Sequence, residues 1–191
     1  MSDPVVSVLM TVYNRETYVP EAIRSVLAST LESFELIIVD DRSRDNSYEI
    51  ARSFAASDQR IRLYRNDSNL GDYPNRNRAA GLASGTYLKY LDSDDLLYHH
   101  GLEVMVRAME DHPLAGIGFE DYCYDGNATL PAQYSPEEIY TRHFFDGGIL
   151  YVGPTGSIYK REFFEQAGGF DPAFGVAADV EFNLRAAAIS P

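Results

Sequence analysis

The fold of this chain is decided near its N-terminus by the stretch Val5-Val6-Ser7-Val8-Leu9-Met10-Thr11-Val12. The run is short, mostly apolar and rich in β-branched residues, which is typical of a strand buried on both faces. Polar residues follow at 14–17, and Pro20 then suits the first turn of a helix. The pattern therefore predicts a strand that leads directly into a helix.

The alternation of strand and helix continues through the first half of the chain. Further strands are predicted at 34–39, 61–64 and 86–91, and apolar residues at helical spacing lie between them and again near 102–109. A run of strand-helix units of this kind favours a parallel sheet with helices on both faces. The fold class predicted from the sequence is therefore α/β.

The second half of the chain is less regular. Short strands are predicted at 115–122, 150–152 and 156–159, a helix start at Ser135-Pro136, and a last helix at about 178–188. No internal repeat or low-complexity tract interrupts the sequence. We predict one domain over residues 1–191, with a regular half at 1–112 and an irregular half at 113–191.

Composition narrows the class of protein. The chain has 191 residues, 45% of them apolar, and a formal net charge of -13, which disfavours nucleic acid as a partner. The single cysteine, Cys123, excludes an internal disulfide and is expected to be a small buried apolar residue. No signal peptide and no membrane span are predicted. The expected location is cytoplasmic, with peripheral attachment to a membrane as the alternative.

Polar side chains gather where the predicted strands end. Thr11 and Tyr13 end the first strand, Asp40 and Asp41 the second, and the cluster Asp92-Ser93-Asp94-Asp95 the fourth. Ligands of open α/β sheets bind beyond the carboxyl ends of the strands, so these residues are expected to line one ligand-binding edge. Asp40 is also read as a turn or cap residue, and Asp41 as the better ligand contact.

The cluster at 92–95 suggests a metal. Carboxylates this close repel one another unless a cation lies among them, and hard oxygen ligands suit Mg²⁺ or Mn²⁺. A cation would also reconcile an acidic protein with a phosphorylated ligand. The alternative is that these aspartates cap the next helix.

Several other site classes are disfavoured. The chain has no G-x-G-x-x-G after its first strand, no Walker A loop and no G-x-S-x-G nucleophile elbow. The four histidines lack metal-site spacing and are expected at the surface or in loops: His99, His100, His112 and His143.

With these features in place, the chain resembles the inverting family 2 glycosyltransferases of the GT-A fold. The resemblance covers almost the whole chain and rests on five motifs in order: 6–14, 34–43, the stretch from Asn69-Leu70-Gly71 to Tyr87, the D-x-D turn at 91–95, and Gly168-Gly169-Phe170-Asp171. It implies a GT-A domain with a nucleotide-sugar-binding half at 1–112 and an acceptor-side half at 113–191. Relatives often continue with further helices beyond this point, so truncation of the acceptor-side half at its C-terminus is an expectation of the resemblance.

The resemblance also implies roles for individual residues. Thr11, Tyr13 and Asp41 would hold the nucleobase, and Arg76 would lie near the base or the diphosphate. Asp92 and Ser93 would contact the nucleotide sugar, and Asp94, with Asp92, would hold Mn²⁺ or Mg²⁺. The donor would be a nucleoside-diphosphate sugar, with UDP-sugars favoured, and the acceptor a saccharide or a lipid-linked molecule.

The implied reaction is a single displacement that inverts the anomeric centre, with Asp179 as the catalytic base. The family usually has a Glu-Asp pair here, but Ala178 replaces the first acid, which leaves Glu181 as a less favoured substitute. The loop 153–157 could line the acceptor pocket. Two other readings are a nucleotide-sugar or glycan-binding domain without turnover and, less favoured, a D-x-D phosphohydrolase, because Leu96 lies where that class needs Thr or Val.

Overall fold

The computed structural model describes residues 3–120 and 131–189. Its centre is a six-stranded sheet in the order β3-β2-β1-β4-β6-β5. The neighbours β3, β2, β1 and β4 run parallel, and β6 runs antiparallel to β4 and β5. The strands are β1 Val6–Val12, β2 Phe34–Asp40, β3 Ile61–Arg65, β4 Tyr87–Tyr90, β5 Ile117–Phe119 and β6 Ser157–Lys160.

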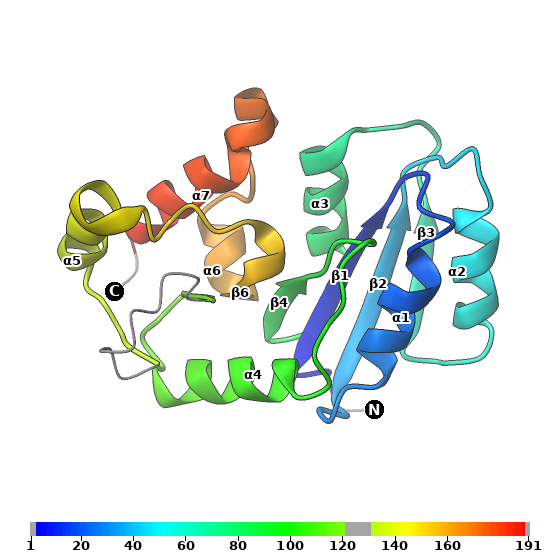
Figure 1. Cartoon of the computed structure of the whole chain (residues 1–191), viewed down its shortest axis with the longest axis horizontal. Helices are drawn as coiled ribbons and strands as arrows, with labels where there is room; N and C mark the ends of the chain where they lie inside the picture. Colours follow the sequence, from blue (N-terminus) through cyan, green and yellow to red (C-terminus); the bar gives the residue numbers. More distant parts are fainter. Residues whose placement is uncertain (1–2, 121–130, 190–191) are drawn as a thin grey trace.

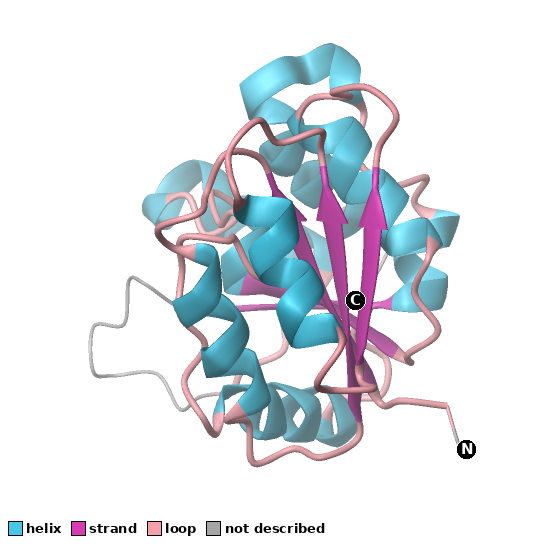
Figure 2. Cartoon of the chain, turned by 90° about the vertical axis from the view of Figure 1, so that its right-hand side faces the viewer, coloured by secondary structure: helices cyan, strands magenta, loops and turns pink. Residues whose placement is uncertain are grey.

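Helices cover the sheet on both faces, as Figure 2 shows. They are α1 Val19–Leu27, α2 Ser47–Ala55, α3 Asp72–Gly81, α4 Gly101–Asp111, α5 Pro136–Thr141, α6 Arg161–Gln166 and α7 Ala178–Ala187. Apolar residues of α1, α2 and α4 pack on one face, and those of α3, α6 and α7 on the other. The prediction of an α/β sheet covered on both sides is confirmed.

The two halves of the chain lie side by side along the sheet. Helices α5, α6 and α7 gather at the end beside β6, while α1, α2 and α3 surround β1, β2 and β3 (Figure 1). Buried aromatic rings join the halves, since Tyr90 of β4 packs against Tyr159 of β6 and Phe170. Two side-chain hydrogen bonds add to this junction, from Asn77 Nδ2 to the Phe170 carbonyl and from the Phe170 amide to Asn77 Oδ1.

The irregular half differs from the sequence prediction in three places. Residues 150–152 form no strand, because the Asn183 side chain binds the carbonyls of Leu150 and Val152 at 3.0 and 2.8 Å in place of a neighbouring strand. Helix α6 was not predicted. In the described residues β5 spans 117–119, whereas Cys123 lies outside them.

None of the helices in the described part of the chain is long and apolar enough to cross a membrane.

Candidate functional site

The predicted edge exists in the structure. Because β2, β1 and β4 are neighbouring parallel strands, their carboxyl ends meet at one edge of the sheet. Thr11 pairs with Val39 near that edge, and Tyr13 follows β1 with 40% of its surface exposed. Both side chains therefore lie where a ligand beyond the strand ends would be.

Asp41 organises the loop that leads into α3. Its Oδ1 accepts hydrogen bonds from Asn66 Nδ2 at 2.6 Å and the Leu70 amide at 2.8 Å, and its Oδ2 accepts one from the Gly71 amide at 2.9 Å. The residue is 3% exposed. A carboxylate has about four acceptor positions, so these bonds leave room for about one further donor.

Asp40 is the last residue of β2, and its side chain caps the turn that follows the strand. Its Oδ1 accepts from the Ser43 amide at 3.2 Å and pairs with Arg65 Nε at 3.0 Å, and its side chain is 1% exposed. Asp40 therefore holds the end of β2 and points away from the solvent.

Arg76 connects α3 to the acidic turn after β4. Its Nη2 lies 2.7 Å from Asp92 Oδ1, and its Nε lies 2.8 Å from Asp72 Oδ1. The guanidinium also lies over the Tyr90 ring. Burial acts to lower the pKa of Arg76, but the charges of Asp92 and Asp72 outweigh it and raise this pKa, so Arg76 supplies a fixed positive charge at the edge.

The D-x-D turn is held by the loop between β5 and β6. The Asp92 amide donates to Thr155 Oγ1 at 3.2 Å, and the Asp95 amide donates to the Asp92 carbonyl at 2.9 Å. Ser93 is buried, while Asp94 is exposed and pairs with Arg15 at 3.3 Å. Burial, followed by the charges of Asp92 and Asp94, raises the pKa of Asp95 despite a hydrogen bond from Thr155.

The donor set of this turn fits a divalent cation. Asp92 and Asp94 have hard oxygen donors that are partly open to solvent, with 34% and 44% of each side chain exposed, and both carboxylates already bind a guanidinium. In residues 3–120 and 131–189 no cluster of three or more His, Cys, Asp or Glu side chains is arranged to hold a metal. Two carboxylates completed by substrate phosphates are what Mg²⁺ ordinarily uses.

Asp179 lies at the start of α7, facing the predicted loop 153–157. A Cβ atom placed on Gly153 would lie 3.8 Å from Asp179 Oδ2, and the Val180 amide donates to Asp179 Oδ1 at 2.7 Å. Tyr73 of α3 also lies close, and burial, followed by the charges of Asp179 and Asp72, raises the pKa of Tyr73 to about 12. Asp179 thus lies near residues from both halves of the chain.

Glu181, the less favoured base, is already paired. Its Oε1 and Oε2 accept hydrogen bonds from Arg185 Nε and Nη2, each at 2.8 Å. Arg185 also donates to the carbonyls of Ala167 and Gly169. Arg185 therefore connects α7 to the turn at Gly168 and Gly169. The φ angles of these residues, 84° and 67°, are in the left-handed region that favours glycine.

Several residues of the site escaped sequence reasoning. Lys89 of β4 is 1% exposed, donates to the Thr155 carbonyl and lies 4.0 Å from Glu120 Oε1. Burial lowers the pKa of Lys89 to about 8. A charged residue within the apolar run 86–91 was a signal that could have found it. Thr155 lies in the loop 153–157 that was expected near the acceptor, but its bond to the Asp92 amide was not predicted, and Arg15 carried no comparable signal.

His143 differs from the expectation that the histidines lie at the surface or in loops, because it is buried and lies in the short helix Arg142–Gly147. It is 5% exposed, its Nδ1 accepts from the Leu150 amide at 3.2 Å, and burial lowers its pKa. The aromatic rings of Phe144 and Tyr151 pack against it and cover it.

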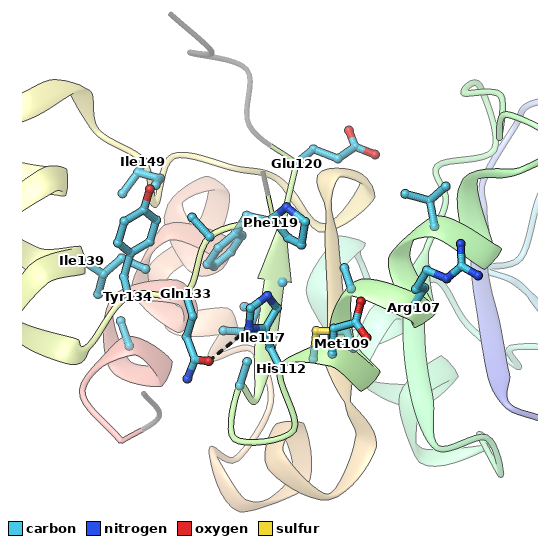
Figure 3. Close-up of a pocket in the computed structure, with 18 of the residues that line it drawn as sticks. Arg107, Met109, His112, Ile117, Phe119, Glu120, Gln133, Tyr134, Ile139 and Ile149 are labelled. Carbon is cyan, nitrogen blue, oxygen red and sulfur yellow. Dashed lines mark hydrogen bonds between the residues drawn. The ribbon is translucent and has the colours of Figure 1, made fainter. Parts of the chain in front are cut away.

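A large cavity lies away from this edge. It encloses about 650 Å³ between α4, β5 and the segment 131–134, with mostly apolar walls and a His112–Gln133 contact of 3.3 Å at its side (Figure 3). The predicted site residues do not line this cavity.

The fold and its polar edge place the chain among the α/β proteins that bind a ligand beyond the carboxyl ends of parallel strands. The chain belongs to glycosyl transferase family 2, whose sequence profile matches residues 7–168. It is 32% identical to the uncharacterized glycosyltransferase EpsJ of Bacillus subtilis over 96% of this chain and 56% of that protein. An uncharacterized glycosyltransferase of Haemophilus influenzae is 35% identical over 66% of this chain and 52% of its own length.

Solved structures show the same fold. TarS of S. aureus, crystallised with UDP, superposes with a TM-score of 0.77 at 21% identity over 95% of this chain and 54% of that chain. The mannosyltransferase PcManGT of Pyrobaculum calidifontis, in complex with GDP-Man and Mn²⁺, gives a TM-score of 0.68 at 19% identity over 96% and 51%. The expected GT-A fold is confirmed, and the chain spans about half the length of these relatives.

Proposed function

We propose that this chain transfers a sugar from a nucleoside-diphosphate sugar to an acceptor hydroxyl. The observation that carries the proposal is the joining of Arg76 to Asp92 at the edge that also holds Thr11 and Tyr13. A fixed cation beside a carboxylate at the end of a central strand suits a diphosphate whose nucleoside lies over neighbouring strand ends.

The nucleoside would lie against the β1 and β2 ends. Tyr13 offers an exposed ring for stacking, Thr11 a hydroxyl, and Asp41 one remaining acceptor position for a ring N–H. Because Asp41 also orders the loop 66–71, base binding and loop order are linked. UDP is favoured on family resemblance, and solved structures of similar fold are complexes with UDP, UDP-GlcNAc or GDP-Man.

Asp94 and Asp92 would hold Mn²⁺ or Mg²⁺, with Ser93 beside the nucleotide sugar. Such a cation, when bound, supplies Lewis-acid stabilisation of the departing diphosphate. Arg76 contributes a second positive charge there, from a buried position that Asp72 and Asp92 fix. The structure of PcManGT is a complex with GDP-Man and Mn²⁺, which supports a metal in this fold.

Asp179 would be the base that removes the proton of the attacking hydroxyl. Its Oδ2 faces Gly153, whereas Glu181 is occupied by Arg185, which supports Asp179 over Glu181. Attack by the acceptor opposite the leaving diphosphate would invert the anomeric centre. A cytoplasmic location and a saccharide or lipid-linked acceptor remain part of this proposal.

A thermal-shift panel tests donor binding. Wild-type protein and Asp94→Asn would be melted with UDP, GDP or dTDP, each with and without Mn²⁺, because a ligand of the native state raises the melting temperature. We expect one nucleotide to stabilise the wild type in a Mn²⁺-dependent way that Asp94→Asn loses. Equal behaviour of the two proteins would refute the metal assignment.

Turnover separates the remaining readings. Transfer, or slow donor hydrolysis, is expected with the nucleotide sugar that the panel identifies. Nucleotide binding without either reaction would favour a binding domain, and release of phosphate from a chromogenic phosphomonoester would favour the phosphohydrolase.

A further inference from the structure

Arg15 forms an ion pair with Asp94, the carboxylate that is proposed to hold the metal. Its Nε lies 3.3 Å from Asp94 Oδ2, and each side chain is 44% exposed. The pair crosses from the loop after β1 to the turn after β4. The guanidinium beside Oδ2 takes one acceptor position of Asp94 and its charge repels a second cation there, so Arg15 and a divalent cation compete for Asp94.

The backbone that carries Arg15 is fixed. The Arg15 amide donates to Ser47 Oγ at 2.7 Å, and the Asn14 amide donates to Ser43 Oγ at 3.0 Å. Asn14 has a φ of 54°, a conformation that asparagine tolerates well, and the Arg44 amide donates to its side chain at 2.8 Å. The loop is therefore anchored to the start of α2, while the long Arg15 side chain remains half-exposed.

We propose that Arg15 is an internal counter-ion of Asp94 which a divalent cation displaces, and that the released guanidinium then binds the diphosphate of the nucleotide. This inference rests on the proposed function. It makes Arg15 a diphosphate-binding residue that differs from Arg76. Arg76 is buried and held by two carboxylates, whereas Arg15 is half-exposed, pairs with the Asp94 carboxylate and makes a long hydrogen bond of 3.5 Å from Nη1 to the Asn14 carbonyl.

Moving Arg15 from Asp94 to a diphosphate requires little free energy. A solvent-exposed ion pair contributes little stability, so leaving Asp94 costs Arg15 little. A guanidinium matches the paired oxygens of a phosphate and forms strong charge-assisted hydrogen bonds with them. Because Arg15 opposes the metal when the nucleotide is absent and supports the nucleotide when the metal is present, each ligand should strengthen the binding of the other.

Binding measurements on Arg15→Gln test this coupling. The probes are Mn²⁺ alone and UDP with saturating Mn²⁺, each measured by isothermal titration calorimetry. Arg15→Gln is expected to bind Mn²⁺ alone about two- to fivefold more tightly, because its competitor is gone. It is expected to bind UDP with Mn²⁺ about tenfold more weakly, because a charged phosphate contact is lost.

Two matched variants control for charge. Arg15→Lys keeps the positive charge but not the planar fork, so intermediate changes are expected. Arg52→Gln removes an arginine that is paired with Glu49 on α2, and it should change neither affinity by more than about twofold. Unchanged melting temperatures would show that all variants fold.

The outcomes separate this inference from the proposed function. A wild-type protein that binds neither Mn²⁺ nor UDP, GDP or dTDP overturns the proposed function. If the wild type binds both ligands but Arg15→Gln shifts both affinities in one direction, or shifts neither, only the role of Arg15 is overturned. An equal effect of Arg52→Gln would also overturn it. GDP replaces UDP as the probe if the wild type prefers it.

Discussion

Arg76 Nη2 lies 2.7 Å from Asp92 Oδ1, and this ion pair joins α3 to the end of β4. The arginine is 7% exposed, whereas the Asp92 side chain is 34% exposed. The buried partner is therefore the cation, and the carboxylate reaches outward to the ligand edge. An arginine in this position neutralises part of the negative charge of the acidic turn. Its positive charge also attracts an anion that binds at the ligand edge.

Replacing Arg76 should affect both stability and binding. Arg76→Gln leaves Asp92 and Asp72 without their shared partner, and we expect a loss of about 1–2 kcal/mol in the free energy of unfolding, since both acids can turn to solvent. Nucleoside diphosphate affinity should fall at least about tenfold. Urea denaturation and calorimetry measure the two effects. Arg78→Gln, on the exposed face of the same helix, is the control, and a similar loss there would contradict the assignment.

Gly85 allows the strand ends to approach closely. A Cβ atom at Gly85 would lie 2.6 Å from the Ser7 amide nitrogen, and the Gly85 amide donates to Ser7 Oγ at 2.8 Å. Gly85→Ala should therefore push β4 from β1 and destabilise the protein by about 1–3 kcal/mol, as overpacking does. Gly81→Ala, where no atom lies within 4 Å of the added carbon, should be neutral or slightly stabilising. Equal unfolding midpoints for the two variants in urea would contradict this account.

The sequence predicts the regular half of the fold well, for a physical reason. Apolar runs such as 34–39 and 86–91 have to be buried on both faces, and this requirement fixes strands, helices and a common carboxyl edge together. The convergence of Thr11, Tyr13 and Asp92 then follows from topology alone. The contacts within the edge do not follow from it, because Arg15–Asp94 joins residues far apart in sequence.

The irregular half is harder to predict because side chains there replace regular backbone pairing. Residues 150–152 are apolar and read as a strand, but Asn183 from α7 binds two of their carbonyls. A single side chain such as Asn183 leaves no periodic pattern in the sequence, and its contact with 150–152 exists only once α7 has packed against them. Thr155 binds the Asp92 amide in the same way, through one hydroxyl.

Lys89 predicts a dependence of stability on pH. Burial lowers the pKa of Lys89 to about 8, whereas an unfolded lysine has a pKa of about 10.4. Between these values the unfolded chain binds more protons, so the free energy of unfolding should rise with pH across this window. Glu120, Asp92 and Asp95 face the ammonium with negative charge and limit the shift.

The comparison with Lys89→Met isolates this effect. The difference in unfolding free energy, wild type minus variant, should increase by about 2 kcal/mol from about pH 8 to about pH 10. Urea titrations at several pH values measure it, and the variant cancels the contributions of other titrating groups. A difference that stays flat or falls over this range would show that Lys89 titrates normally.

Asp179 and Glu181 lie in the same first turn of α7, and mutagenesis should separate their roles. Asp179→Asn removes the proposed base without removing volume, so turnover should fall about 10²–10⁴-fold while nucleotide affinity stays within about twofold. Glu181→Gln breaks a partly exposed pair with Arg185, which keeps its bonds to Ala167 and Gly169. That variant should lose at most about 1 kcal/mol of stability and retain most of its turnover.

Initial rates of nucleoside diphosphate release at saturating donor, with calorimetry of nucleotide binding, test both expectations. The reverse pattern, an active Asp179→Asn and an inactive Glu181→Gln of unchanged stability, would move the base to Glu181 and require Arg185 to release it during the reaction.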